Sequence, residues 1–232
     1  SNTLTAGLVY SPSWAEGLSF TVDYWRVKLE QFITRLPENV LLNQCYSFAR
    51  YCDTFVRDDA GDVAQMTNVI GNFGTLETDG FDVSVGYLFP ETAWGKFSFN
   101  LDTSYIASYD VRLLSGDPTS DVTAFPTIPG SSGLVGTFVD SASSGFGNIA
   151  RWRGLSTLQW TFGNLNASLT NRYVHHVYEA PDAGDPSEDG FVSKRRIPSV
   201  TQTDLQIGYT FEELNKSSIQ IGVRNLTDRQ PP

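Results

Sequence analysis

The stretch KFSFNLDTSYIASYD, residues 96–110, alternates between apolar and polar residues along its whole length. The mostly apolar parity runs from Phe97 through Ala107 to Tyr109. The polar parity runs from Lys96 to Asp110, with Ile106 as its one apolar member. Successive side chains of a strand point to opposite faces, so this pattern predicts a strand with one apolar and one polar face. At about fifteen residues, it is far longer than an ordinary strand of about five or six.

The same alternation recurs along the chain, as in GLSFTVDYWRV (17–27), GFDVSVGYLFP (80–90) and SSIQIGVRN (217–225). Turn-forming Pro, Gly and Asn residues separate several of these runs. The sequence therefore predicts an all-β fold, an antiparallel meander of long strands. We place the strands at about residues 3–11, 17–34, 73–89, 95–113, 146–162, 164–180, 198–212 and 216–226.

Two architectures use such strands: a soluble β-sandwich, which buries the apolar face, and a large transmembrane β-barrel, which turns that face to lipid. The connections favour the barrel, because short turns alternate with long loops at about 35–72, 114–145 and 181–197. The polar face favours it too, because it carries charges near strand centres. Candidate lumen-facing residues are Asp82, Lys96, Asn100, Asp102, Arg172, Asp204 and Arg224.

The expected orientation can be stated for individual residues. We expect lipid to contact Phe97, Phe99, Val83, Val85, Ile207 and Tyr209. Aromatic residues also gather where strands meet the short turns, at the level that lipid headgroups favour. These residues are Tyr10, Tyr24, Tyr87, Phe89, Trp94, Trp160, Phe162, Tyr209 and Phe211.

The first long loop contains further structure. PENVLLNQCYSFARYC (37–52) predicts a short helix whose apolar face is formed by Val40, Leu41 and Tyr46. The only two cysteines, Cys45 and Cys52, are close in sequence, which suggests a disulfide-closed loop in an oxidising compartment. TFVRDDAGDVAQM (54–66) predicts a small hairpin that turns at residues 60–61.

Signals for catalysis, cofactors and nucleic acid are poor. A net charge of −10 argues against nucleic acid as a partner. GFGNIA (145–150) matches a dinucleotide fingerprint, but a strand-like pattern follows it where that site needs a helix. His175 and His176 are adjacent, so on a strand they would point to opposite faces and could not share a metal. We expect no enzyme, no cofactor and no metal site, although four acids of loop 181–197 leave a calcium ion open.

Several segments resemble the C-terminal half of a TonB-dependent outer-membrane receptor. SNTLTAGLVYSP, GLSFTVDYWRVKLEQFI and LLNQCY resemble the family's strand–turn–strand–helix passage. NFGTLETDGFDVSVGYLFP resembles a later strand, with Gly74, Thr78, Gly80, Phe81 and Asp82 at the typical positions. IQIGVRNLTDRQPP resembles the penultimate strand and its ending, at Asn225, Leu226, Asp228, Pro231 and Pro232.

The resemblance implies that residues 1–232 are a C-terminal portion of such a barrel, without its plug domain and last strand. It implies a bacterial outer membrane, contact with outer-membrane lipid, and energy supplied by TonB through the N-terminal plug region. The substrate would be a scarce large nutrient, with siderophore, cobalamin and oligosaccharide all open. The alternatives are a passive porin-like channel and a soluble β-sandwich module that binds carbohydrate.

Overall fold

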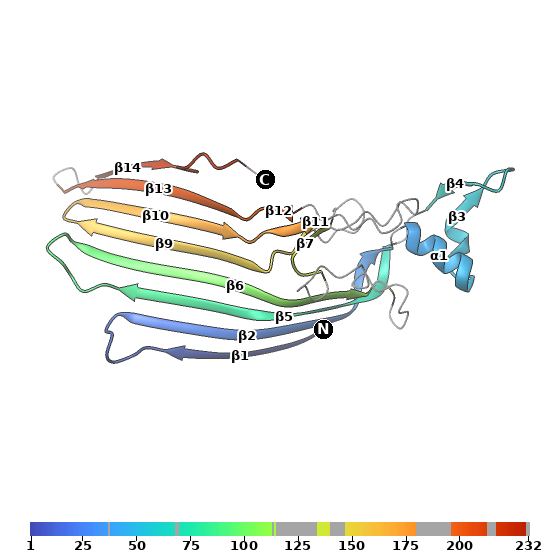
Figure 1. Ribbon diagram of the computed structural model, residues 1–232, viewed down its shortest axis with the longest axis horizontal. Helices are drawn as coiled ribbons and strands as arrows, with labels where there is room; N and C mark the ends of the chain where they lie inside the picture. Colours follow the sequence, from blue (N-terminus) through green and yellow to red (C-terminus); the bar gives the residue numbers. More distant parts are fainter. Residues whose placement is uncertain are drawn as a thin grey trace.

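The computed structural model describes residues 1–36, 38–67, 70–112, 114, 134–139, 147–179, 196–212 and 217–230. Eight long strands lie side by side in one antiparallel sheet, in the order β1-β2-β5-β6-β9-β10-β13-β14 (Figure 1). Their bounds are Asn2–Tyr10 (β1), Leu18–Arg35 (β2), Ile70–Leu88 (β5), Lys96–Arg112 (β6), Trp152–Phe162 (β9), Leu165–Val174 (β10), Val200–Phe211 (β13) and Ser217–Val223 (β14). The predicted meander of eight strands is confirmed.

Two predicted strand ends are wrong, because the chain changes sheets there. The strand predicted to start at residue 146 begins at Trp152, and β8 (Gly147–Asn148) belongs to a separate small sheet. The strand predicted to reach residue 180 ends at Val174, and β11 (Val177–Glu179) joins that same small sheet. The other two strands of this sheet are β7 (Thr137–Val139) and β12 (Arg196–Ile197).

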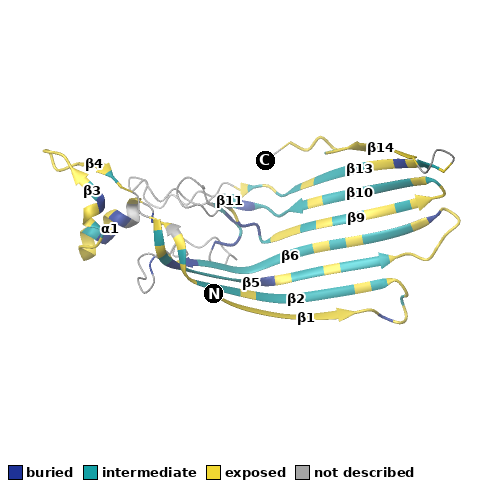
Figure 2. Cartoon of the chain, turned by 180° about the vertical axis from the view of Figure 1, so that it is seen from behind, coloured by how far each residue is buried: buried dark blue, intermediate teal, exposed yellow. Residues whose placement is uncertain are grey.

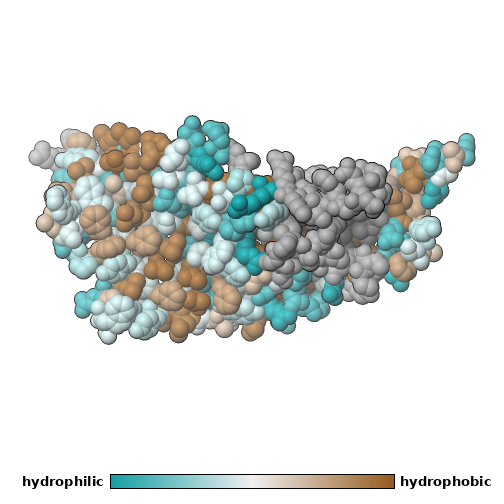
Figure 3. Space-filling model, viewed as in Figure 1, coloured by the Kyte–Doolittle hydropathy of each residue, from teal (hydrophilic) through white to brown (hydrophobic). Residues whose placement is uncertain are grey.

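The strand register separates two faces of the large sheet. Val85 is paired with Phe20 and Leu101, and Phe99 is paired with Tyr87 and Leu158. These residues share what we call the apolar face. The opposite polar face carries rows such as Asp23, Asp82 and Ser104. Figure 3 shows apolar side chains gathered over the half of the sheet near the short turns, with hydrophilic ones toward the long loops.

Two aromatic rows bound the apolar face. Near the short turns, ring contacts join Tyr87 to Phe89 (4.4 Å), Trp160 to Phe162 (6.2 Å) and Tyr209 to Phe211 (4.7 Å). The second row lies toward the long loops, where Tyr24 is paired with Phe81, Phe81 with Tyr105, and Tyr105 with Trp152. The placement of Tyr24 beside a short turn was therefore wrong, because it belongs to this second row. Paired aromatic girdles flank the lipid-facing band of transmembrane barrels.

A β-bulge turns strand β6 over near its long-loop end. Gly80 is paired with Ile106 and Asp79 with Ser108, so Ala107 is the extra residue. Beyond the bulge, Tyr109 and Val111 lie on the same face as Ile106. The prediction that Tyr109 shares a face with Phe97 is therefore wrong, and Ile106, the one apolar residue on the polar parity, directly precedes the extra residue.

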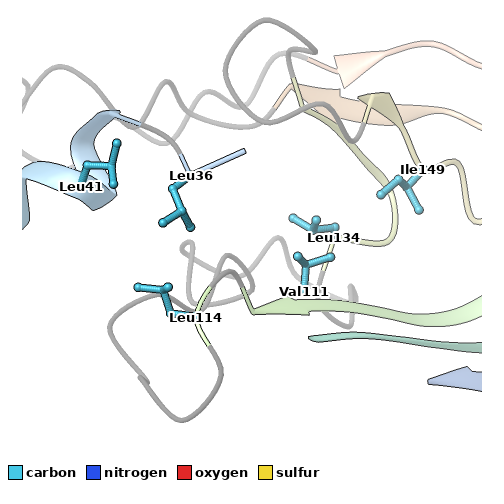
Figure 4. Packing of buried hydrophobic residues seen from close by; sticks show 6 residues of the cluster. All are labelled: Leu36, Leu41, Val111, Leu114, Leu134 and Ile149. Carbon is cyan, nitrogen blue, oxygen red and sulfur yellow. The ribbon is translucent and has the colours of Figure 1, made fainter. Parts of the chain in front are cut away.

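A hydrophobic cluster forms on that face at the long-loop end, where Figure 2 shows most of the buried residues. Its buried members are Leu36, Leu41, Val111, Leu114, Leu134 and Ile149 (Figure 4). Ile106, Tyr109 and Leu76 pack against them. The cluster holds the long connections on the end of the sheet by burying their apolar side chains.

The first long loop has the elements that the sequence predicts. Helix α1 (Glu38–Phe48) is followed by the turn η1 (Cys52–Thr54) and the hairpin of β3 (Phe55–Arg57) and β4 (Val63–Met66). Within the described residues, no helix has the length and apolar character to cross a membrane.

The packing of α1 corrects one prediction. Leu41 is fully buried, but Tyr46 is 94% exposed and does not share its packed face. Val40 is among the residues whose side chains are not described.

Candidate functional site

The polar face of the large sheet gathers the predicted site residues. One register row contains Asp102, Leu155, Arg172 and Gln202. The adjacent row contains Asn100, Thr157, Thr170 and Asp204. Asp82 lies on the same face beside Ser104. Five of the seven residues therefore share the middle of one face, on strands that are far apart in sequence.

The β2–β5–β6 side of this face is acidic. Asp23 and Asp82 are directly opposite each other in the register, an arrangement that destabilises a sheet through repulsion. The two carboxylates are directed apart. Ser104 donates to Asp82 (2.6 Å), while the Asp23 carboxylate leans over Gly7, where an added Cβ would lie 1.9 Å from Oδ1. Ser84 donates to Asp102 (2.7 Å), so hydroxyl groups support two of the three acids.

The β10–β13 side carries a paired charge instead. The Arg172 guanidinium donates to the Asp204 carboxylate. Asp204 also accepts the backbone N–H of Asn225 (2.9 Å), which fixes the turn after β14. Asp204 is thus a structural anchor as well as a polar-face residue.

One candidate lies away from this centre. Lys96 is at the short-turn end of β6, with Nζ 3.7 Å from Oε2 of Glu91 in the turn, and both side chains are mostly exposed. Arg224 directly follows β14, and because its neighbour Asn225 donates to Asp204, it lies beside the row that contains Asp204.

The loop beside the hydrophobic cluster is covalently closed. Cys45 of α1 and Cys52 of η1 form a disulfide, with their Cα atoms 4.9 Å apart, which confirms the predicted bridge. The hairpin beyond it turns at Gly61 (φ 91°), and the Asp58 carboxylate accepts the N–H groups of Ala60 and Asp62. This gives the extended loop two local restraints.

The histidine pair departs from the sequence prediction. The chain leaves strand geometry between β10 and β11, so the rings of His175 and His176 lie side by side with centroids 4.0 Å apart. Arg196 donates to Nδ1 of His176 (3.2 Å). Desolvation, with added repulsion from Arg196, lowers the pKa of both imidazoles below the usual value. The sequence alone gave no sign that the strand stops here.

A metal site has no support in the described part of the chain, where no group of three or more His, Cys, Asp or Glu residues is placed to hold an ion. The four acids of loop 181–197 lie outside the described residues.

Comparison with known proteins identifies the sheet. Residues 1–226 match the family described as "TonB dependent receptor-like, beta-barrel". The chain belongs to this family. TonB-dependent receptors are outer-membrane proteins of Gram-negative bacteria, so the two aromatic rows have a membrane setting. No curated protein sequence matches the chain.

Solved structures with the same fold include three transporters or receptors. The outer membrane transporter YddB from Escherichia coli has a TM-score of 0.58 at 12% identity, over 99% of this chain and 29% of that one. The FrpB iron transporter from Neisseria meningitidis has a TM-score of 0.56 at 13% identity, over 98% and 27%. A mutant of the ferric enterobactin receptor (PfeA) from Pseudomonas aeruginosa has 0.55 at 14%, over 98% and 25%. The chain thus spans little more than a quarter of these proteins.

Proposed function

We propose that the chain is a C-terminal portion of the barrel of an outer-membrane receptor that imports a scarce large nutrient with energy supplied by TonB. The observation that carries the proposal is the family match over residues 1–226, together with one continuous sheet. The receptor would contact TonB through a plug region outside this chain. Its binding would rest on shape and polar contacts, with no covalent chemistry.

The polar face supplies the second part of the argument. We infer that the rows containing Asp82, Asp102 and Asp204 line a water-filled interior, and that the long loops lie outside the cell. This is supported by the two aromatic rows, which bound the apolar face only. Carboxylates without an ion-pair partner, such as Asp23 and Asp82, keep their hydration in a water-filled interior, whereas a dry core would impose a large desolvation free energy on them.

The soluble β-sandwich alternative does not fit the sheet. A sandwich needs a second sheet packed on the apolar face, and within the described residues that face has exposed side chains such as Leu8, Ile207 and Ile221. Lipid is the environment that accepts such a surface without a packed partner.

Uptake by the full-length receptor tests the proposal. The receptor would be expressed in a bacterial host that lacks its own siderophore and cobalamin receptors, with and without functional TonB. We expect accumulation of one labelled substrate among ferric siderophores, cobalamin and oligosaccharides, and only with functional TonB. Passive flux of small sugars that is independent of TonB would instead establish the porin-like channel and overturn the proposal.

A further inference from the structure

The small sheet joins two of the long connections at the loop end of the molecule. Strands β7 and β8 belong to the connection between β6 and β9, and β11 and β12 belong to the connection between β10 and β13. Their order in the sheet is β12-β11-β7-β8, so its central pair, β11 and β7, comes from two different connections (Figure 1). We call this sheet, together with residues 134–136 and 149–150, the loop junction.

The pairing of β7 with β11 is parallel, which a short turn cannot produce. Thr137 is the register partner of Tyr178, and the Tyr178 N–H donates to the carbonyl oxygen of Gly136 (2.8 Å). Parallel strands need a long crossover, and the chain makes it here through β8 and the β9–β10 hairpin. The pairing thus depends on the large sheet, in which β6, β9 and β10 are neighbours.

Backbone hydrogen bonds continue from this pair into both connections. On the β7 side, the Gly136 N–H donates to the carbonyl oxygen of Ile149 (2.8 Å), and the Ile149 N–H donates to that of Thr137 (3.0 Å). On the β11 side, Val177 is the register partner of Ile197 in β12. A continuous series of hydrogen-bonded neighbours therefore runs from β8 through β7 and β11 to β12.

The loop junction is also closely packed. More than half of the buried apolar residues that the structure describes belong to it, namely Leu134, Val135, Ile149, Ala150 and Val177. Leu134 and Ile149 are members of the hydrophobic cluster, and the Leu134 N–H donates to the carbonyl oxygen of Tyr109 in β6 (2.8 Å). The junction is thus a packed unit that is anchored on the large sheet.

The first long loop is attached differently. Leu36 and Leu41 pack in the hydrophobic cluster, but β3 and β4 form a separate two-stranded sheet. Among the described residues, no backbone hydrogen bond joins residues 38–67 to the loop junction. This loop therefore shares the cluster with the junction but not its backbone pairing.

We propose that the loop junction makes the β6–β9 and β10–β13 connections one cooperative unit, which unfolds locally as a whole and independently of the first long loop. Local unfolding occurs in contiguous units that share hydrogen bonds and buried contacts. Because β7 and β11 pair with each other, unfolding of either strand removes hydrogen bonds from the other. Such coupling is reciprocal, so a molecule that binds and stabilises one connection also stabilises the other. This inference goes beyond nutrient import, because it depends only on the pairing and burial within the junction.

Hydrogen exchange of the full-length receptor in detergent, followed by mass spectrometry of its peptides, tests the coupling in both directions. Val177→Asp buries a carboxylate in the β10–β13 connection, and exchange is measured at β7 and β8. Val135→Asp makes the same change in the β6–β9 connection, and exchange is measured at β11 and β12. Both valines are almost completely buried, so the two perturbations are equivalent. We expect exchange to become roughly tenfold or more faster across the whole junction in each variant.

Leu41→Asp is the matched control, because Leu41 is equally buried and belongs to the same hydrophobic cluster. It should accelerate exchange in α1 and leave β7 and β11 close to their original rates. The β9–β10 hairpin, which lies between the two connections in sequence, should keep its protection in all three variants. Val177→Ala and Val135→Ala add no charge and should give the same pattern with a smaller acceleration, so the test stands even if the aspartate variants do not fold.

Three outcomes would overturn the proposal. Acceleration confined to the mutated connection would show that the two connections unfold separately. Equal acceleration of the junction by Leu41→Asp would show that the cluster, and not the pairing of β7 with β11, carries the coupling. Loss of protection in the β9–β10 hairpin together with the junction of the alanine variants would show that the junction is not a separate unit. Uptake of nutrient does not enter these measurements, so failure here leaves the proposed import function intact.

Discussion

The two ends of β5 and β6 carry their apolar side chains on opposite faces of the sheet. Near the short turns, the apolar residues Val85 and Leu101 share one face, and Ser84 and Asp102 share the other. Near the long loops, Glu77 and Asp79 lie on the same face as Val85. Leu76 and Val111 lie on the same face as Asp102 and belong to the hydrophobic cluster. At the long-loop end the apolar residues thus face the hydrophobic cluster, and near the short turns they lie on the opposite face, between the two aromatic rows.

The two strands make this reversal in different ways. In β5 the sequence changes parity: the apolar positions are odd from Phe81 to Tyr87, and the apolar position is even at Leu76. In β6 the apolar positions other than Ile106 are odd from Phe97 to Val111, and the bulge at Ala107 reverses the face to which the later side chains point. The extra residue in β6 thus moves the apolar side chains to the opposite face, as the change of sequence pattern does in the neighbouring strand β5.

The largest expected effect is a charge placed in the cluster at the long-loop end. Val111 has no exposed surface, so Val111→Asp would bury an unpaired carboxylate and remove packed methyl groups. We expect the loop-end structure to lose about 3–5 kcal/mol of stability. Hydrogen exchange of α1 and β3–β4 in the full-length receptor measures this loss.

A control at the same level sharpens the result. Thr75 is paired with Arg112 on the face of Glu77, so Thr75→Asp should change hydrogen exchange little. If both variants behaved alike, the two faces at this end would not differ as described.

The sequence predicted the parts of the molecule that local pattern determines. Strand number, the two faces in the middle of the sheet, the hairpin and the disulfide all follow from alternation, turn residues and cysteine spacing. The bulge was missed. Ile106 interrupts the alternation directly before Ala107, but one apolar residue does not show where the extra residue lies, because that depends on pairing with β5. The ring contact of His175 and His176 was missed for a related reason. It depends on β10 ending at Val174, where pairing with neighbouring strands stops, and that information is not local.

A smaller effect is expected at the middle of the apolar face. Val85 lies between Phe20 and Leu101 in the register and between the two aromatic rows. Val85→Arg should cost about 2–4 kcal/mol in a bilayer, because a guanidinium near the midplane is poorly solvated. Thr75→Arg, on the same face of the same strand beyond the second row, should cost about 0–1 kcal/mol. Denaturant unfolding in lipid vesicles measures both, and equal costs would contradict the lipid-facing assignment.

The smallest expected effect comes from deleting Ala107. This residue is extra in β6, so its loss lets Ser108 follow Ile106 directly, with both keeping their present partners Asp79 and Gly80. Tyr109 and Val111 then stay on the face of the hydrophobic cluster, and we expect a change within about 1 kcal/mol. Deleting Val83 is the matched control, because between residues 80 and 88 β5 has no bulge in its pairing with β2 or with β6 that could absorb the one-residue shift. That deletion should exchange the faces of part of β5 and prevent stable folding. Heat-dependent gel mobility of the full-length receptor reports folding, and labelling of Val111→Cys in each background reports the face. Outward labelling at position 111 after loss of Ala107 would show that the bulge itself, and not the cross-strand pairing, holds the loop end of β6 the right way round.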